Sequence, residues 1–415
     1  MKKMKDYKNH YAIQGRLYPS LEQKRTIKRY GGSARFVYNR LVAINNEIYL
    51  LKKALIYLSF IVARIAYLKE SISSAKNIRN SAPFLYDINI DVIDNAIKNY
   101  NTAWKNHKER HTGIPTFHKK SEDYSYSVNP HYNKDSVSMN DCSGCYVVDK
   151  NHVVIAGLGV VKVKFSPKMI KALLSRTAET RLGTFTVSHD ATGKYYVSIN
   201  IASDTPFVEP YEKTGKKAGV DLNLRNFLTD SDDHEIENLK PLRKAEKHLK
   251  QQQRKLSKKA ERAKKEKREL SESKNYQKQK LKVAKIHKHI ANQRDDLHQR
   301  AAVYELKNHD VVYAEDLKVK NMLKNHNLAK AISDTGWRTF LILMQEKANL
   351  RGRKFELVPP RNTTQTCSDC GYVLKDGEQI DLTVEHWNCP NCGKYHKRDH
   401  NAAINILNKG LEMHP

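Results

Sequence analysis

Three carboxylates stand in places where a buried strand ends or a helix begins. Asp221 lies within the apolar run Ala218–Leu222, Glu315 ends the run Val311–Glu315, and Asp399 precedes the final helix. A buried carboxylate is costly unless it is paired or binds a metal ion, and Mg²⁺ prefers carboxylate oxygens and water. An aspartate before a helix is most often only a cap. As a set, however, the three suit metal-dependent hydrolysis of phosphodiesters, in which two ions activate water and stabilise the leaving oxygen.

A second group of residues has the spacing of a zinc site. Two Cys-x-x-Cys pairs are separated by 18 residues, and a glycine follows each pair. They are Cys367, Cys370, Cys389 and Cys392. Four thiolates on two tight turns suit tetrahedral Zn²⁺, and a four-cysteine site is closed and structural. A third pair, Cys142 and Cys145, has no second pair nearby, so two ordinary thiols are the better interpretation.

The net charge points to a polyanionic partner. The 415 residues include 74 Lys and Arg against 45 Asp and Glu, a formal charge of +29. Residues 241–300 alone hold 21 Lys and Arg against 7 Asp and Glu, a net of +14. A solvated coiled-coil face is the alternative for this segment, but such a face usually mixes signs, so the imbalance favours phosphate contact.

A membrane is a weaker choice of partner. The most apolar stretch, 54–63, has ten residues between basic residues, which is too short to span a bilayer. We expect it to form the buried face of a helix. No apolar signal region follows the basic start of the chain, which favours a cytoplasmic protein, associated with the nucleoid in a prokaryote.

Local patterns predict the elements that position these groups. A strand over 10–19 should stop at Pro19, and Ser20 with Gln23 forms a capping box for a following helix. Helical periodicity continues to about 107, and strands follow, including a hairpin over 184–201. A long helical hairpin is expected over 239–308, because leucines recur every seven residues and a turn signal stands at 271–275.

Four separated motifs resemble the TnpB family, the RNA-guided nucleases of insertion sequences, which are similar to compact type V CRISPR effectors. They are Gly219-Val-Asp-Leu-Asn-Leu-Arg-Asn-Phe, Ala314-Glu-Asp-Leu-Lys-Val-Lys-Asn-Met, Asn362-Thr-Thr-Gln-Thr-Cys-Ser-Asp-Cys-Gly and Arg398-Asp-His-Asn-Ala-Ala-Ile-Asn-Ile. Near the start, Gly15-Arg-Leu-Tyr-Pro and Arg35-Phe-Val-Tyr-Asn also resemble the opening of that family. One departure is Asn223, where many members have glycine.

The resemblance implies an RNA-guided DNA endonuclease. Such an enzyme binds a guide RNA from the end of its own element, recognises a short motif beside the target, and cuts both strands of double-stranded DNA in one RuvC-like site. Asp221, Glu315 and Asp399 would hold two Mg²⁺ ions, or Mn²⁺. Contacts to nucleic acid are expected from a further set: Arg35, Tyr38, Asn39, Lys255, Lys258, Arg262 and Arg398. A CRISPR-associated effector, a transposase that needs no RNA and a non-catalytic nucleic-acid binder are the alternatives.

The fold class expected from these patterns and from the resemblance is an α+β multidomain protein. A β-barrel-like module would comprise 1–33 and 113–205, with a helical recognition insertion at 34–112. A RuvC-like α/β nuclease domain of the ribonuclease H fold would comprise 206–361 and 396–415, with the basic hairpin 239–308. A zinc ribbon would occupy 362–395. The sequence carries no signal for an oligomeric state.

Overall fold

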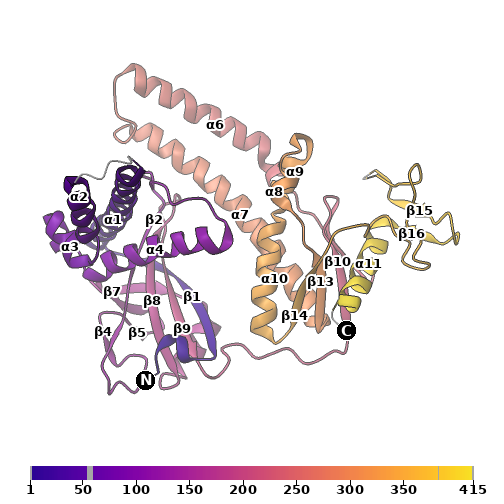
Figure 1. The fold of residues 1–415 in the computed structure, drawn as a ribbon, viewed down its shortest axis with the longest axis horizontal. Coiled ribbons are helices and arrows are strands. Elements are labelled where there is room, and N and C mark those ends of the chain that lie inside the picture. Colours follow the sequence, from indigo (N-terminus) through magenta and orange to yellow (C-terminus); the bar gives the residue numbers. More distant parts are fainter. Residues whose placement is uncertain (1, 54–58, 382, 414–415) are drawn as a thin grey trace. The chain divides into compact units, whose positions relative to one another are not determined.

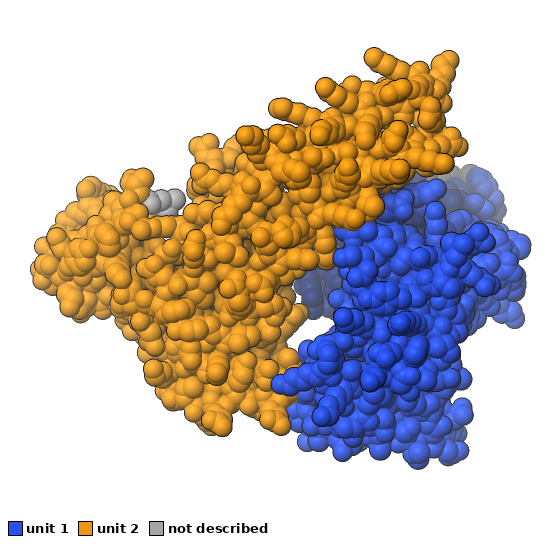
Figure 2. Space-filling model, turned by 180° about the vertical axis from the view of Figure 1, so that it is seen from behind, with its two compact units in different colours: residues 1–207 blue, residues 208–415 orange. Residues whose placement is uncertain are grey.

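The computed structural model describes residues 2–53, 59–381 and 383–413, and the chain divides into two compact units, 1–207 and 208–415 (Figure 2). Unit 1 contains, in chain order, η1 (Met4–Asp6), β1 (Asn9–Tyr18), α1 (Leu21–Lys53), α2 (Ser59–Ser71), α3 (Ala75–Ser81), η2 (Pro83–Asp87), α4 (Ile90–Arg110), β2 (Tyr124–Val128), β3 (His131–Tyr132), β4 (Cys142–Ser143), β5 (Tyr146–Asp149), β6 (His152–Ile155), β7 (Gly159–Lys164), α5 (Pro167–Leu174), β8 (Thr180–His189) and β9 (Tyr195–Ser203).

Unit 2 contains β10 (Lys217–Asp221), β11 (Asn226–Asp230), β12 (Glu235–Glu237), α6 (Pro241–Lys265), α7 (Lys274–Asn308), β13 (Val311–Glu315), α8 (Val319–Met322), α9 (His326–Thr335), α10 (Trp337–Arg351), β14 (Lys354–Val358), β15 (His386–Asn388), β16 (Tyr395–Lys397) and α11 (Arg398–Met413) (Figure 1).

The start of α1 confirms the predicted capping box. The hydroxyl of Ser20 accepts a hydrogen bond from the backbone N–H of Gln23 at 3.2 Å, and the Gln23 side chain accepts one from the N–H of Ser20 at 2.9 Å. These reciprocal bonds satisfy two donors that a helix N-terminus leaves unpaired. The helix then continues past residue 33, so it spans the boundary expected between the first module and the helical insertion.

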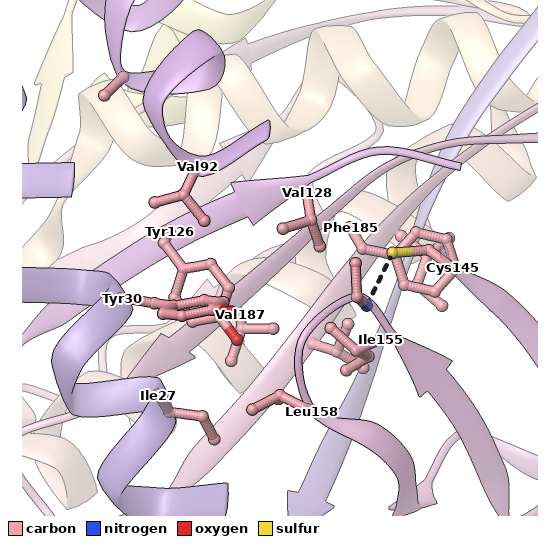
Figure 3. Packing of buried hydrophobic residues seen from close by; sticks show 14 of the residues in the cluster. Ile27, Tyr30, Val92, Tyr126, Val128, Cys145, Ile155, Leu158, Phe185 and Val187 are labelled. Carbon is pink, nitrogen blue, oxygen red and sulfur yellow. Dashed lines mark hydrogen bonds between the residues drawn. The ribbon is translucent and has the colours of Figure 1, made fainter. Parts of the chain in front are cut away.

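Antiparallel strands form the core of unit 1. Its seven-stranded sheet has the order β2-β8-β9-β1-β7-β6-β5, and β1 pairs with both β9 and β7. Side chains of the sheet pack with Ile27 and Tyr30 of α1 and Val92 of α4 (Figure 3). Among the pairings of the described residues none joins β2 to β5, so closure into a barrel stays a prediction.

Cys145 is part of this apolar core. It is fully buried, and its Sγ accepts a hydrogen bond from the backbone N–H of Ala156 at 3.3 Å (Figure 3). Burial raises the pKa of the Cys145 thiol to about 12. The Sγ of Cys142 donates to the carbonyl of Cys145 at 3.3 Å. Both thiols therefore have ordinary partners within unit 1.

The predicted burial of the apolar stretch 54–63 is wrong where it can be checked. Residues 54–58 lie outside the described part of the chain, and α2 begins at Ser59. Phe60 and Val62 are 66% and 54% exposed. The reason is that α2 buries only Leu68, which packs against Ile44 and Ile48 of α1. No helix among the described residues is long and apolar enough to cross a membrane.

In unit 2, helices cover both faces of a five-stranded sheet. The strand order is β12-β11-β10-β13-β14, and β10, β13 and β14 are parallel to one another. Parallel neighbours need long crossovers, and the hairpin α6–α7 and the helix α10 provide them. Helices α7 and α10 pack on one face, and α11 packs on the other (Figure 1).

The helical hairpin forms as its seven-residue pattern predicts. Leu249 of α6 packs against Val283 and Ile290 of α7, and Leu242 and Leu256 extend this stripe. The turn between the helices falls at 266–273, next to the predicted turn signal. Since the apolar residues occupy the seam between the helices, most of the basic side chains are left exposed to solvent.

Candidate nuclease centre and cysteine cluster

The register of the parallel strands brings Asp221 and Glu315 to the same edge of the sheet. The last paired residues of β10 and β13 are Val220 and Ala314. Asp221 and Glu315 each follow by one residue, so they lie beside each other at the carboxyl ends of neighbouring strands. Because adjacent strands are about 4.8 Å apart, the two carboxylates share one small region.

Side-chain alternation places both carboxylates on the face covered by α11. Val220 and Ala314 pack into the apolar core formed with α7 and α10. Side chains alternate between the faces of a strand, so Asp221 and Glu315 point to the opposite side. Tyr313, two residues before Glu315, confirms this direction because it packs against Ile406 of α11.

Close backbone contact places Asp399 on the same side. A Cβ on Gly219 would overlap the carbonyl of Ala403 and the amide of Leu407, so α11 lies directly on β10 at this glycine. Asp399 is one helical turn before Ala403, hence on the same face of α11. The final helix begins at Arg398, directly after β16. The expectation that Asp399 precedes the helix is therefore wrong: it lies in the first turn.

The three carboxylates are near enough for Glu315 and Asp399 to affect the pKa of Asp221. Asp221 is 6% exposed, and burial together with the negative charges of Glu315 and Asp399 raises its pKa to about 8. Burial also raises the pKa of Glu315, while the Thr363 hydroxyl, which donates a hydrogen bond to Glu315, and the nearby charge of Lys409 act to lower it. Among the described residues, the oxygens of the three carboxylates do not all lie within 4.8 Å of one another.

Three neighbours bind these carboxylates. The sequence singled out Arg398 only as a contact to nucleic acid, Asn223 only as a departure from the family pattern, and Thr363 not at all. The side-chain amide of Asn223 donates to Asp221 at 3.3 Å. The guanidinium of Arg398 binds Asp399 at 2.7 and 2.9 Å and is itself buried. Thr363 is buried beneath Glu315. All three belong to the motif stretches, which is the sequence signal that could have assigned them this role.

Two asparagines of α11 fasten the segment that leads into the cysteine cluster. Asn401 donates to the carbonyl of Thr366 at 2.8 Å and accepts from the amide of Ser368 at 2.9 Å. Asn405 donates to the carbonyls of Thr363 and Thr366 at 2.9 and 2.6 Å. Buried amides that bond backbone groups fix their position, so the helix carrying Asp399 and the segment carrying Thr363 form one rigid part.

The four predicted zinc cysteines come together. Their sulfur atoms all lie within 4.8 Å of one another. The separations are 3.8 Å between Cys367 and Cys392 and 3.7 Å between Cys370 and Cys389. A tetrahedral ion with metal–sulfur bonds of about 2.3 Å requires sulfur–sulfur distances of about 3.8 Å, so the residues fit zinc. The Nε2 of His396 lies 3.1 Å from the sulfur of Cys367 and can support that thiolate.

The residues expected to contact nucleic acid have different surroundings. Lys255, Lys258 and Arg262 are exposed and lie on one side of α6, three and four residues apart. In unit 1, Tyr38 stacks on His118 at 4.0 Å, and Asn39 makes two hydrogen bonds to the backbone of His118, at 3.0 and 2.8 Å.

The two remaining residues of this set, Arg35 and Arg398, also have different surroundings. Arg35 lines a cavity of about 480 Å³ within unit 1. Arg398 is buried, and its guanidinium donates to Asp399 and to the carbonyl of Asp381. Lys255 and Lys258 thus present their charges to solvent, whereas Arg262 pairs with Glu266 at 2.8 Å and Arg398 has partners inside unit 2.

Comparison with known proteins gives a consistent result. Residues 9–53 match a family described as a helix-turn-helix domain, 195–326 one described as "Probable transposase", and 337–406 one described as "Cas12f1-like, TNB domain". A Streptomyces pristinaespiralis protein named "Putative RNA-guided DNA endonuclease" is 26% identical over 404 residues, which cover 96% of this chain and 89% of that protein. A "TnpB-like protein" of Acanthamoeba polyphaga mimivirus is 24% identical over 415 residues, covering 96% and 72%.

A solved structure shares the fold. The Cas12f1 protein in a cryo-EM structure of a Cas12f1–sgRNA–target DNA complex matches with a TM-score of 0.51 at 14% identity, covering 97% of this chain and 99% of that one. The fold and the cysteine cluster therefore define a mixed α/β, multidomain protein that resembles the compact Cas12f effectors. The matched family descriptions and the relatives support a protein of the TnpB family.

Proposed function

We propose that this protein is an RNA-guided DNA endonuclease whose single cutting site comprises Asp221, Glu315 and Asp399. The observation that carries the proposal is the convergence of three carboxylates from β10, β13 and α11 on one face of the sheet. There, burial together with the negative charges of Glu315 and Asp399 raises the pKa of Asp221. A bound cation would offset this repulsion, because an opposite charge within about 4–6 Å favours the ionised carboxylate. Relatives named as RNA-guided DNA endonucleases over nearly the whole chain support the same activity.

Each part of the chain has a role in this proposal. Bound Mg²⁺ or Mn²⁺, as two ions, would supply an activated water and stabilise the leaving oxygen. Asn223 and Arg398 orient Asp221 and Asp399, and Thr363 orients Glu315. Unit 2 would then be a RuvC-like nuclease domain with an inserted zinc ribbon, in which Zn²⁺ has a structural role only.

The nucleic-acid partners follow from the charge and from the relatives. A guide RNA from the element's end would be held by phosphate contacts, including those of Lys255, Lys258 and Arg262 on the exposed side of α6. Pairing of the guide would select the target strand of double-stranded DNA beside a short motif. Unit 1 would supply the barrel-like module and the helical recognition insertion.

The test uses the full-length protein purified with its RNA. Asp221→Ala should reduce cleavage of a matched double-stranded target by at least about 1,000-fold, because it removes a group that acts only in the reaction, while binding of the RNA stays unchanged. Asp316→Ala is the matched control, since this carboxylate is the next residue after Glu315 but is half-exposed and pairs with Lys318. Cleavage by the Asp221→Ala protein at the normal rate would refute the proposal.

The family description "Probable transposase" favours a second candidate, DNA strand transfer without RNA. The same preparation distinguishes the two. After ribonuclease treatment to remove the RNA, an RNA-guided endonuclease loses sequence-specific cutting. A strand-transfer enzyme still joins DNA ends. Joined products in the RNA-free sample would favour the second candidate.

A further inference from the structure

A second cluster of titratable residues lies in unit 2 on the other face of the sheet. Asp230 ends β11, and His234 stands at the end of the short turn before β12. Asp230 pairs with Val220, so its side chain shares the face that α7 covers. Glu305 comes from the last two turns of α7. None of these residues belongs to the proposed cutting site, which lies under α11.

Burial in this cluster is complete for both carboxylates. Asp230 and Glu305 each have 0% exposure. The Oδ1 of Asp230 accepts hydrogen bonds from the backbone N–H groups of Asp232 and His234 at 2.9 and 2.8 Å. Those bonds fix the carboxylate, yet its Oδ2 has no hydrogen-bond partner among the described residues. By the same criterion, neither carboxylate oxygen of Glu305 has a hydrogen bond, although its Oε2 lies 3.3 Å from the Nδ1 of His309, and the Nδ1 of His234 has none.

These unpartnered atoms converge on one point. One ligand atom each from Asp230, His234 and Glu305 lies within 4.8 Å of the other two. The Oδ2 of Asp230 and the Nδ1 of His234 are 3.9 Å apart, which is too long for a hydrogen bond. Ligands that share one ion at about 2.0–2.2 Å are separated by about 3–4 Å, so the 3.9 Å between Asp230 and His234 fits coordination of a common ion.

The charge of the cluster also favours a bound cation. His309 is the nearby basic group, with its Nδ1 3.3 Å from the Oε2 of Glu305 and its Nε2 3.4 Å from Asp232. Its single positive charge, when it is protonated, is shared with Asp232. His234, 3.9 Å from Asp230, likewise carries charge only when protonated. A bound cation would offset the two fully buried carboxylates, and an uncompensated buried charge is costly.

We propose that Asp230, His234 and Glu305 bind a divalent transition-metal ion, of which Zn²⁺ is the best fit. An imidazole nitrogen with two carboxylate oxygens suits Zn²⁺ or Mn²⁺, whereas Mg²⁺ and Ca²⁺ prefer oxygen alone. The stacking of His234 on Tyr304, with ring centroids 3.9 Å apart, holds the imidazole in place. The ion joins the β11–β12 turn to the end of α7, and thus fastens the base of the basic hairpin to the sheet.

The test measures metal content and stability in a protein whose proposed cutting site is disabled. In the full-length Asp221→Ala protein, mass spectrometry should find one zinc ion in the cysteine cluster and one further ion after dialysis against Zn²⁺. Adding His234→Ala should remove only the further ion. Zn²⁺ should also raise the melting temperature by several degrees in the parent and not in the His234→Ala protein, because an ion that binds only the folded state stabilises it.

Two further variants make the result decisive. His234 is about one-third exposed, so its replacement should leave the fold intact, and Glu305→Gln keeps the shape of the buried side chain while removing a charged ligand. His152→Ala is the matched control, because His152 forms an exposed pair with Asp149 at 3.0 Å in unit 1. A parent protein with zinc only in the cysteine cluster, and no thermal shift with Zn²⁺ or Mn²⁺, would overturn the proposal.

Discussion

The two faces of the sheet in unit 2 are held by different forces. On the face of α7 and α10, a large apolar cluster buries side chains such as Phe340 and Met344. On the face of α11, the apolar cluster is small, and the helix is instead fixed by backbone contact at Gly219 and by amide bonds from Asn401 and Asn405. Stability should depend mainly on the first face and cleavage on the second, since polar contacts position groups but contribute little net free energy.

Among substitutions outside the three carboxylates, the largest effect should come from a single added methyl group at the centre of the α11 face. Gly219→Ala would force α11 away from β10, because the new Cβ meets backbone atoms that cannot move independently. The displacement carries Asp399 with it. Since a shift of about 1 Å can reduce catalysis about 100-fold, we expect at least that loss of cleavage, with a fall of about 1–3 kcal/mol in the free energy of unfolding.

Gly32→Ala is the control for this substitution. Gly32 lies in α1, and apart from the backbone of that helix no described atom comes within 4 Å of the place that the new methyl group would take. The change should be neutral or stabilising by up to about 1 kcal/mol, as expected for alanine in a helix, and cleavage should be unaffected. Equal activity of the Gly219→Ala and wild-type proteins would mean that contact at this glycine does not position Asp399.

Removal of zinc should give the next largest effect on cleavage. The cysteine cluster is joined through Thr366 and Ser368 to Asn401 of α11, so loss of the ion loosens the helix that carries Asp399. Cys389→Ser should lower the zinc content by one ion and reduce cleavage about 10-fold or more, because structural zinc contributes directly to folding. Cys145→Ser, in the core of unit 1, should leave the zinc content unchanged. Full cleavage in a zinc-free sample would mean that the zinc ion does not help to position Asp399.

A substitution on the apolar face of α7 and α10 should reduce stability strongly and cleavage only slightly. Met344 is fully buried against the sheet, and Met344→Ala should lower the free energy of unfolding by about 2–5 kcal/mol. Below the melting transition, cleavage should remain within a few-fold of the wild type, because none of the three carboxylates lies on this face. Urea denaturation together with a cleavage assay at low temperature tests both statements. A 100-fold loss of cleavage without loss of stability would contradict the division between the faces.

Local sequence patterns predicted most of the elements, and the three carboxylates that they singled out come to one face of the sheet. The capping box at Ser20, the hairpin leucines such as Leu249 and the paired cysteines all act over a few residues, so their effect is visible in the sequence. Contacts between distant segments were not visible in this way. Nothing near Gly219 indicates that α11, almost 200 positions later, requires a residue without a side chain there.

Burial of polar groups was the hardest feature to predict. Asp230 and His234 look like an ordinary hairpin turn, and only folding places Glu305 of α7 beside them. The positive charge of Arg398 suggested a contact to nucleic acid, but its guanidinium is buried against Asp399. For Phe60 and Val62 the error was the opposite: burial was predicted, but both side chains are exposed. Apolar composition alone does not determine what a helix packs against.

The smallest effect concerns a buried imidazole on the apolar face. His298 is 1% exposed, bonds the carbonyl of Thr335 at 2.8 Å and stacks on Phe227. Burial lowers its pKa below the ordinary value of 6.5. The unfolded chain therefore takes up a proton at this position more readily than the folded one, so the free energy of unfolding falls as the pH drops below about 6.5 and is fully present above it. His298→Gln should lower stability at pH 7.5 yet flatten this dependence between pH 7.5 and 5.5, as measured by urea denaturation at several pH values. A slope identical to that of the wild type would show that His298 titrates equally in both states, and the face would then owe its acid sensitivity to other groups.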